Sequence, residues 1–549
     1  MKTSEWVVGM SLAGLLASPF CVLAAQPVPA PAAANLASFT NLDFELGAPG
    51  ELPPGWSVPK SLADQGFSAM LTTNQPNHGK QCAEIRWPGG RTGPTNLFAN
   101  LSQRIDATAW RGKRIRVTAA IRVSSGENGK RAQMWLRVDC PGRVGALENM
   151  DKRPVRLQTW ADYAITADVA DDAQRIVLGL LTLNGATAWW DNVRIEVLQR
   201  PQTPKPTLSY QSEDVLFENA KARVKLAGTV TRPDGRGPFP ALILISGSGP
   251  QDRDETLFGH KPFAVIADFL SRNGYAMLRY DDRGFGKSSG DFGSATTEDF
   301  SYDAEAALDY LKNRREIDPK RIGFIGHSEG GLVAPMIAAR RADVGFVVLL
   351  AAPGISGEEI ALAQAETRSR MMGFSEDYLQ KSRPLRREAI RRLRSNLSSD
   401  EEKTKSDETE RRMLPLMGKE DKQLYEKLKA GFDAGSELRM AGIRSPWMQF
   451  MLRYDPAADL QRVKCPVLAL NGQLDTQVRA SQNLPAIEKN LKEGGNTQFT
   501  VKELKGLNHL FQTAQTGDTS EYDEIEESFS PSALSEILTW LNVNAKTSE

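Results

Sequence analysis

Five consecutive residues near the middle of the chain, Gly326-His327-Ser328-Glu329-Gly330, fit the pattern G-x-S-x-G. This pattern places a serine on a tight turn between a strand and a helix, where glycines remove side chains that would clash. The neighbouring residues meet that requirement, because an apolar strand at 321–326 precedes the turn and a helical segment at 331–340 follows it. The pattern predicts that Ser328 is a nucleophile at the carboxyl ends of the strands.

A serine hydroxyl needs a neighbouring base to act as a nucleophile. The chain contains four histidines: His78, His260, His327 and His509. Where this elbow occurs, the order along the chain is serine, acid, histidine, so the base must follow the serine. His327 adjoins Ser328, and we expect its side chain to point away along the turn. His509, in a loop after the strand 499–506, is therefore the predicted base.

The acid that orients the base must lie at the end of a strand. Asp475 is the first carboxylate after the predicted strand PVLALNG (466–472), and this position makes it the predicted acid. Asp455 is the second candidate. It precedes Pro456, and an aspartate before a proline is a common turn element.

The tetrahedral intermediate of acyl transfer needs N–H donors for its oxyanion. The N–H of Glu329, the residue after the nucleophile, is the first expected donor. The second is expected from the loop 246–254, which begins with small residues that allow close backbone approach. We favour the N–H of Ser248, with Gly249 as the alternative.

The segment 282–288, DRGFGKS, could be mistaken for a phosphate loop. It lacks the spacing G-x-x-x-x-G-K-[ST] and the strand–helix context, so we interpret it as a structural loop whose charged residues pair locally. The cysteines show no Cys-x-x-Cys spacing for zinc. The sequence predicts neither a cofactor nor a metal.

Alternating strands and helices from residue 208 onward must position these residues. Apolar strands at 239–247, 321–326 and 345–354 alternate with helical patterns, one of which, 297–315, has Thr297 as its expected cap. The alternation predicts an α/β fold with a parallel sheet covered on both faces.

One long segment, 356–462, contains no convincing strand and predicts a helical cap inserted into the sheet domain. The cap divides the α/β core into a first part, 208–355, and a second part, 463–549. We expect the charged run 382–412 to be the solvated face of the cap.

The region 38–198 has a different pattern. Short runs of alternating apolar and polar residues, such as 115–123 and 174–183, predict strands, and 126–130 is a hairpin-turn signal. Many strands without helices predict a β-sandwich. The Pro-rich segment 199–207 predicts a linker between this domain and the α/β domain.

Composition excludes several classes of protein. The 549 residues carry 68 basic and 68 acidic side chains, which argues against nucleic-acid binding. A hydrophobic content of 40% is enough to form cores. Cys82 and Cys140 could pair in an oxidising compartment, or remain two buried thiols, and the sequence leaves both open.

The N-terminus has the pattern of an export signal. Residues 6–25 are almost uncharged and end in small residues, so 1–25 is a predicted signal peptide, followed by a Pro/Ala tether at 26–37. An uncleaved anchor is the rival, for which about 20 apolar residues suffice. We expect a periplasmic or secreted protein that has no contact with a membrane after cleavage.

Several segments of the chain resemble a known group of enzymes. The segments 247–255, 260–292, 326–331, 455–478 and 506–522 look like secreted or periplasmic esterases of the α/β-hydrolase superfamily, to which serine aminopeptidase-like proteins are related. The resemblance covers about 208–545. It implies a serine carboxylesterase for short acyl esters, with Ser328, Asp475 and His509 as nucleophile, acid and base.

The N-terminal region resembles galactose-binding-like jelly rolls at 41–45, 55–56 and 190–193. This looser resemblance implies contact with carbohydrate. The aromatic side chains that would stack on a sugar, or instead fill the core, are Trp87, Trp135, Trp189 and Trp190.

The sequence therefore predicts an exported serine hydrolase that cleaves a small-molecule ester through an acyl-enzyme, without nucleic acid as a partner. A serine aminopeptidase-like amide hydrolase would use the same three residues. A third hypothesis, from a different class of protein function, is a glycan-binding protein with a subsidiary esterase domain.

Overall fold

The computed structural model describes residues 39–59, 62, 66–87, 98–124, 130–151, 154–198, 202, 204, 209–395, 399–433, 444–522 and 524–545. The predicted signal peptide, the tether, residues 126–129 of the predicted turn and most of the predicted linker lie outside these residues. The chain divides into two compact units between Arg200 and Pro201. The exact domain boundaries given above stay predictions.

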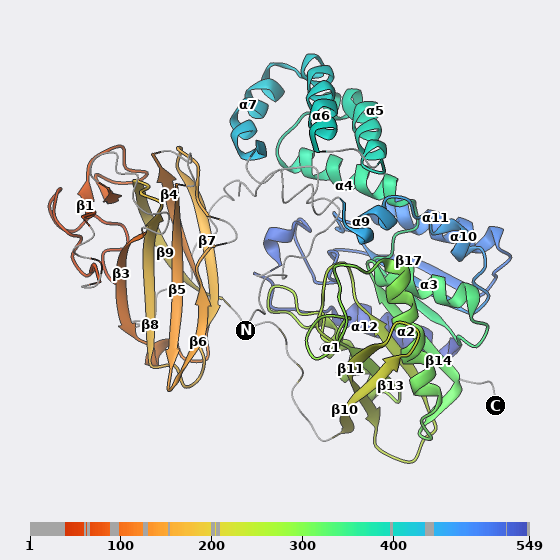
Figure 1. The fold of residues 1–549 in the computed structure, drawn as a ribbon. Helices are drawn as coiled ribbons and strands as arrows, with labels where there is room; N and C mark the ends of the chain where they lie inside the picture. Colours follow the sequence, from red (N-terminus) through yellow and green to blue (C-terminus); the bar gives the residue numbers. More distant parts are fainter. Residues whose placement is uncertain are drawn as a thin grey trace. The chain divides into compact units, whose positions relative to one another are not determined.

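The N-terminal unit consists of two antiparallel sheets (Figure 1). The five-stranded sheet has the order β1 (Ser68–Thr72), β2 (Cys82–Arg86), β9 (Ala188–Leu198), β4 (Arg114–Val123) and β7 (Ala161–Asp168). The four-stranded sheet has the order β3 (Phe98–Asp106), β8 (Arg175–Leu183), β5 (Arg131–Cys140) and β6 (Arg143–Glu148).

Both sheets contribute side chains to one apolar core, which includes Ile121 and Trp190 from the first sheet and Leu136 and Leu178 from the second. The predicted β-sandwich is therefore confirmed. The jelly-roll connectivity stays a prediction. Cys82 and Cys140 are buried free thiols.

The C-terminal unit is built on an eight-stranded sheet. Its order is β10 (Tyr210–Asn219), β11 (Val224–Pro233), β13 (Ala276–Tyr280), β12 (Phe239–Ile245), β14 (Ile317–His327), β15 (Val347–Leu350), β16 (Val467–Gly472) and β17 (Phe499–Leu504). The pairs β10–β11 and β11–β13 are antiparallel, and all remaining pairs, from β13 to β17 in this order, are parallel. The central strands are buried on both faces, as their continuous apolar runs predict.

Helices cover both faces of this sheet (Figure 1). The helices α2 (Thr297–Lys312), α3 (Gly330–Arg340) and α11 (Ala480–Glu493) pack on one face. The helices α1 (Pro262–Arg272) and α12 (Pro531–Asn544) pack on the other. The predicted α/β fold is confirmed. The cap of α2 was predicted one residue late, because Thr296 forms the capping box with Asp299.

Between β15 and β16 the described residues form helices joined by turns, and no strand. The helices are α4 (Gly357–Met371), α5 (Glu376–Arg392), α6 (Ser399–Met413), α7 (Lys419–Asp433), α9 (Pro446–Met451) and α10 (Ala457–Leu460). Side chains of α4, α5 and α9 form an apolar cluster with Leu332, which lies in the first turn of α3. The cap thus packs directly on the helix that follows the predicted nucleophile.

The prediction that 382–412 is only a solvated face is wrong for α5. Arginines on this helix pair with α4 carboxylates: Arg383 with Glu366 (2.6 Å), Arg387 with Glu359 (2.7 Å) and Arg391 with Glu358 (2.7 Å). Glu358 and Glu366 are buried. The charged run therefore joins two cap helices, because buried carboxylates need cationic partners.

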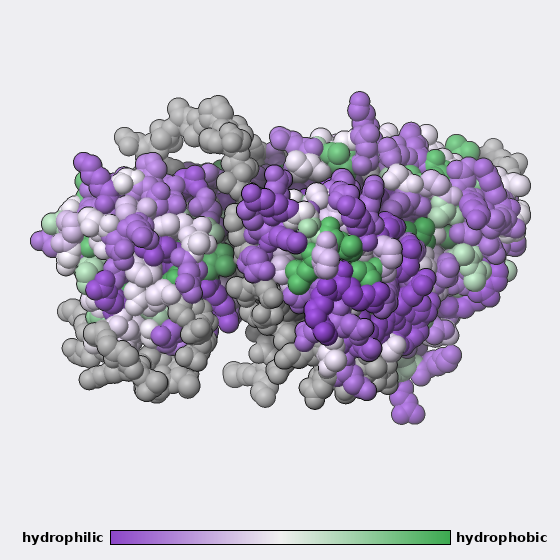
Figure 2. All heavy atoms as spheres, turned by 90° about the horizontal axis from the view of Figure 1, so that it is seen from above, coloured by the Kyte–Doolittle hydropathy of each residue, from purple (hydrophilic) through white to green (hydrophobic). Residues whose placement is uncertain are grey.

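Hydrophilic residues dominate the face drawn in Figure 2, and hydrophobic residues form small groups on it. Within the described residues, no helix has both the length and the hydropathy needed to cross a membrane.

Candidate active site

Ser328 lies on the sharp turn between β14 and α3. Its φ is +52°, in the left-handed region that non-glycine residues rarely adopt, and its N–H donates to the carbonyl of Leu350 at 2.8 Å. A Cβ on Gly326 would lie 2.1 Å from the carbonyl oxygen of Gly330, and a Cβ on Gly330 would lie 2.2 Å from that of Ile245. The two glycines of the pattern are required because backbone passes directly over both positions.

The side chain of His509 joins Ser328 to Asp475. His509 Nε2 lies 3.1 Å from Ser328 Oγ, and His509 Nδ1 lies 2.7 Å from Asp475 Oδ2. The other oxygen of Asp475, Oδ1, accepts from the N–H groups of Gln477 and Val478, both at 2.8 Å. The carboxylate is therefore held at both ends, and it orients the imidazole with Nε2 toward the serine.

The sheet brings these three residues together from distant parts of the chain. Ser328, Asp475 and His509 follow β14, β16 and β17, and the carboxyl ends of parallel strands lie at one edge of a sheet. Asp455, the second acid candidate, is elsewhere: its Oδ1 accepts from the N–H of Ala457 at the start of α10.

The expected oxyanion donors lie beside the nucleophile. Within the described part of the chain, no acceptor is found for the N–H groups of Glu329, Ser248 or Gly249. The N–H of Gly247, by contrast, donates to Glu255 Oε1 at 2.6 Å. A Cβ on Gly247 would lie 3.2 Å from the Cβ of Ser328, so the loop after β12 passes close to the serine.

The side chain of Glu329 is buried beneath the cap. Its Oε1 accepts from the hydroxyl of Thr297 at 2.6 Å and from Trp447 Nε1 at 2.7 Å. Its Oε2 has no partner among the described residues. Burial raises the pKa of Glu329, and the hydrogen bonds from Thr297 and Trp447 only partly offset this effect. Sequence patterns did not reveal Thr297 or Trp447 as neighbours of the site.

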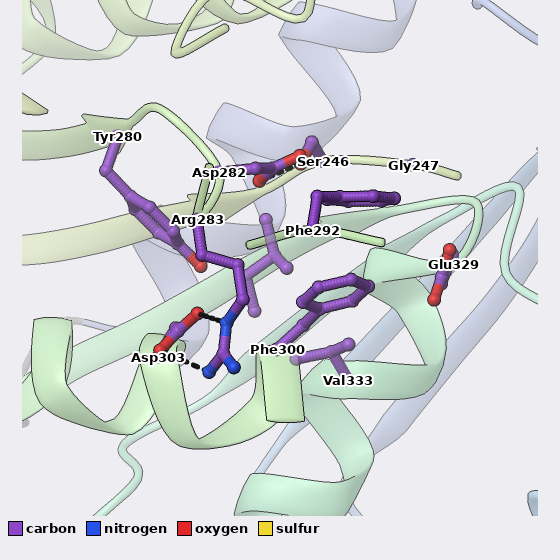
Figure 3. Close-up of a pocket in the computed structure, with 11 residues that line it drawn as sticks. Ser246, Gly247, Tyr280, Asp282, Arg283, Phe292, Phe300, Asp303, Glu329 and Val333 are labelled. Carbon is purple, nitrogen blue, oxygen red and sulfur yellow. Dashed lines mark hydrogen bonds and ion pairs between the residues drawn. The ribbon is translucent and has the colours of Figure 1, made fainter. Parts of the chain in front are cut away.

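The loop 282–288 contacts the loop 246–254, which contains the expected oxyanion donors. The charged residues of 282–288 therefore pair beyond their own loop, and not only locally as predicted. Asp282 accepts from the Ser246 hydroxyl and the Gln251 N–H, both at 2.9 Å. Arg283 pairs with the buried Asp303 of α2 at 2.6 Å. Asp282, Arg283 and Asp303 line a small pocket of mixed polar and apolar character, together with Ser246, Glu329, Phe292 and Phe300 (Figure 3). Burial raises the pKa of Asp282 well above its ordinary value.

His327 does not point away from the site as expected. Its Nδ1 lies 2.8 Å from Glu255 Oε1, and its Nε2 lies 3.0 Å from the backbone carbonyl of His509. Burial acts to lower the pKa of His327, but the charge of Glu255 and the two hydrogen bonds raise it above the ordinary value. This contact went unpredicted because Glu255 is 72 residues away in the sequence.

The described residues contain no group of three or more His, Cys, Asp or Glu side chains that could hold a metal ion. The buried Asp191, in the N-terminal unit, accepts from the N–H groups of Asn77 and His78.

The sheet order and the helices on both faces define the C-terminal unit as an α/β-hydrolase fold, and the strained elbow at Ser328 is where this fold carries its nucleophile. Comparison with known families agrees, since residues 261–513 match the family described as "Serine aminopeptidase, S33".

Two curated relatives are similar to this chain. Esterase EstD of Thermotoga maritima is 28% identical over 312 residues, which cover 57% of this chain and 62% of that protein. The putative hydrolase YtaP of Bacillus subtilis is 34% identical over 122 residues, 19% of this chain and 40% of that protein. The chain thus spans less than two thirds of either relative.

Among solved structures, the Pyrococcus furiosus esterase Pf2001 aligns with 64% of this chain and 99% of its own, at 17% identity and a TM-score of 0.37. A similarity of that size carries no argument about activity.

Proposed function

We propose that the protein is an exported serine hydrolase that cleaves carboxylic esters through an acyl-enzyme. The observation that carries the proposal is the hydrogen-bonded series Ser328–His509–Asp475, with distances of 3.1 and 2.7 Å. The similarity to Esterase EstD supports ester rather than amide substrates.

In the first half-reaction, Ser328 Oγ attacks the acyl carbon of the ester while His509 Nε2 accepts the hydroxyl proton. Asp475 holds His509 in the tautomer whose Nε2 is free to accept, because Asp475 Oδ2 accepts from Nδ1. The developing oxyanion is bound by the N–H groups of Glu329 and Ser248. His509 then gives its proton to the leaving alcohol, and the acyl group stays on Ser328.

In the second half-reaction, His509 Nε2 accepts a proton from water, whose oxygen attacks the acyl carbon. The same two N–H groups bind the second oxyanion. Collapse of this intermediate releases the carboxylic acid and returns the proton to Ser328. None of these steps uses a cofactor.

The acyl preference and the choice between ester and amide are tested together. We expect hydrolysis of nitrophenyl acetate and butyrate, with less turnover of octanoate, and Ser328→Ala should abolish it. Aminoacyl anilides should be turned over far more slowly. Anilide turnover of comparable rate would favour the aminopeptidase-like alternative, and Ser328-independent ester turnover would refute the proposal.

Export is a separate part of the proposal and rests on the residues 1–25 alone. The protein recovered from the periplasm or medium should begin near residue 26, as shown by N-terminal sequencing. Recovery of the full-length chain from the membrane fraction would favour the uncleaved anchor instead.

We further propose that the N-terminal unit contacts glycan through Trp135 of β5. The ring of Trp135 lies over Gly179 of the neighbouring strand, because a Cβ there would lie 2.0 Å from Trp135 Nε1, and that nitrogen donates to Asn100 at 3.0 Å. A half-buried ring lying flat on a sheet offers its other face for stacking on a sugar. Trp190 and Trp189 are buried, and Arg122 covers the Trp189 ring.

Deletion of residues 26–206 should weaken retention on a glycan panel while sparing hydrolysis of small esters. Trp135→Ala should have the same effect on retention. Trp87→Ala is the matched control, because the Trp87 ring packs on Phe67 and its Nε1 donates to Thr182. Unchanged retention of the deletion variant on every glycan would refute this proposal.

A further inference from the structure

A second buried histidine–carboxylate pair lies next to the proposed catalytic residues. It consists of His327, the last residue of β14, and Glu255, in the loop between β12 and α1. Their side chains are 6% and 1% exposed. The reaction steps above assign neither residue a role, although the imidazole rings of His327 and His509 have centroids only 5.0 Å apart.

The partners of this pair determine where its protons are. The carbonyl oxygen of His509 can only accept, so His327 Nε2, 3.0 Å away, carries a proton. Glu255 Oε1 accepts from the N–H of Gly247 and also lies 2.8 Å from His327 Nδ1. The two ring nitrogens of His327 therefore contact two different parts of the site.

Three segments meet at this pair. His327 directly precedes the nucleophile, its Nε2 holds the main chain of the base, and Glu255 holds the loop that supplies Ser248. The packing around Gly247 shows how close the segments are. A Cβ there would lie 3.2 Å from Glu255 Oε1, 3.2 Å from the Cβ of Ser328 and 3.5 Å from His327 Nδ1.

The backbone adopts an uncommon conformation to bring Glu255 to this place. Its φ is +51°, which costs free energy for a residue other than glycine. The N–H of Glu255 donates to the carbonyl of Asp252 at 2.9 Å, so a tight turn presents the carboxylate to His327.

We propose that His327 and Glu255 act as a pair of positioning residues that set the distance between the nucleophile, the base and the oxyanion donors. This inference rests on the proposed hydrolase function. His327 acts through the main chain of His509, and Glu255 acts through Gly247 on the adjacent N–H of Ser248.

The expected effect is on the chemical step rather than on folding alone. A misplacement of catalytic groups by about 1 Å can cost about 100-fold in rate. His327→Gln and Glu255→Gln should each lower kcat about 10- to 100-fold and leave KM within about 3-fold. The rate at which a fluorophosphonate probe labels Ser328 should fall by the same factor as kcat, because labelling also needs His509 but no particular ester.

The double variant separates a coupled pair from two independent contributions. If the two side chains act as one unit, His327→Gln/Glu255→Gln should be no slower than the slower single variant. Losses that multiply in the double variant would overturn the proposal.

His260 offers a matched control. It is also a fully buried histidine, 2.6 Å from the carbonyl of Tyr522 and 3.0 Å from Ser528 Oγ, and neither of these two contacts is with a catalytic side chain. His260→Gln should lower Tm while keeping kcat and the labelling rate within about 2-fold of wild type. An equal loss of kcat in His260→Gln would overturn the proposal, because general destabilisation would then explain both.

The outcomes distinguish this inference from the proposed function. Wild type that neither hydrolyses esters nor labels at Ser328 overturns both. Active wild type with single variants of unchanged kcat, within about 3-fold, overturns only the positioning role.

Discussion

Replacing Asp475 by asparagine tests the arrangement of the site with a change of one atom. Asp475 Oδ1 accepts from two backbone N–H groups, and Oδ2 accepts from His509 Nδ1. An asparagine has one acceptor oxygen and one NH2 group. Its oxygen must stay with the two N–H groups, because turning the amide over would leave two buried donors without an acceptor, at about 1–3 kcal/mol each.

The NH2 group of Asn at this position then faces His509 Nδ1 and forces that nitrogen to accept. The proton of the neutral imidazole moves to Nε2, which lies 3.1 Å from Ser328 Oγ and can no longer take the serine proton. Asp475→Asn should lower kcat about 10³- to 10⁴-fold, equivalent to about 4–5.5 kcal/mol of transition-state stabilisation. KM should change little, since the Asp475 side chain is fully buried.

The assay is steady-state hydrolysis of nitrophenyl butyrate, with thermal unfolding of each variant to confirm folding. Asp455→Asn is the control, because Asp455 only accepts from the N–H of Ala457, and its kcat should stay within about 2-fold of wild type. A loss in Asp475→Asn below about 10-fold would refute the reasoning about the tautomer.

Three further changes have expected outcomes. The folded state raises the pKa of Glu329 above 4.5, so it binds more protons than the unfolded state, and the stability of wild type falls as pH rises from 4.5 through the pKa of the folded state. The Tm of Glu329→Gln should therefore rise relative to that of wild type between pH 4 and pH 8. A Tm difference that stays constant over this range would contradict the prediction. Gly326→Ala should lower the free energy of unfolding in urea by about 1–3 kcal/mol or more and abolish turnover. Gly418→Ala is the control, because its Cβ would meet only a side-chain oxygen at 3.7 Å, and its urea midpoint should stay close to that of wild type. Trp447→Phe removes a donor from the buried Glu329 and should cost about 1–3 kcal/mol in the same urea assay at pH 8, a prediction that an unchanged midpoint would exclude.

Local sequence carries most of the information about the fold. The apolar runs that form β12, β14, β15 and β16 are short and bounded by turn residues, which is typical of a buried parallel sheet. The cap was visible for the same reason, because a long segment without strands interrupts the alternation. The ends of elements were less certain, since Thr296 and Thr297 are adjacent residues with the same capping group.

The contacts of charged residues could not be predicted in the same way. The arginines of α5 looked like a solvated surface because their spacing along one helix says nothing about what packs against it. Their carboxylate partners lie on α4, and only the packing of α4 against α5 in the folded cap brings the charges together.

The sequence by itself determined which residue types the site contains and their order along the chain. A glycine-flanked serine, a later aspartate at a strand end and one later histidine are local features, and each has its own chemical requirement. Only the tertiary structure decided how the neighbouring side chains complete the site. Glu255, Trp447 and the inward-facing ring of His327 meet there because the sheet and the cap bring together loops from distant parts of the sequence, and no periodicity within a single segment encodes such contacts.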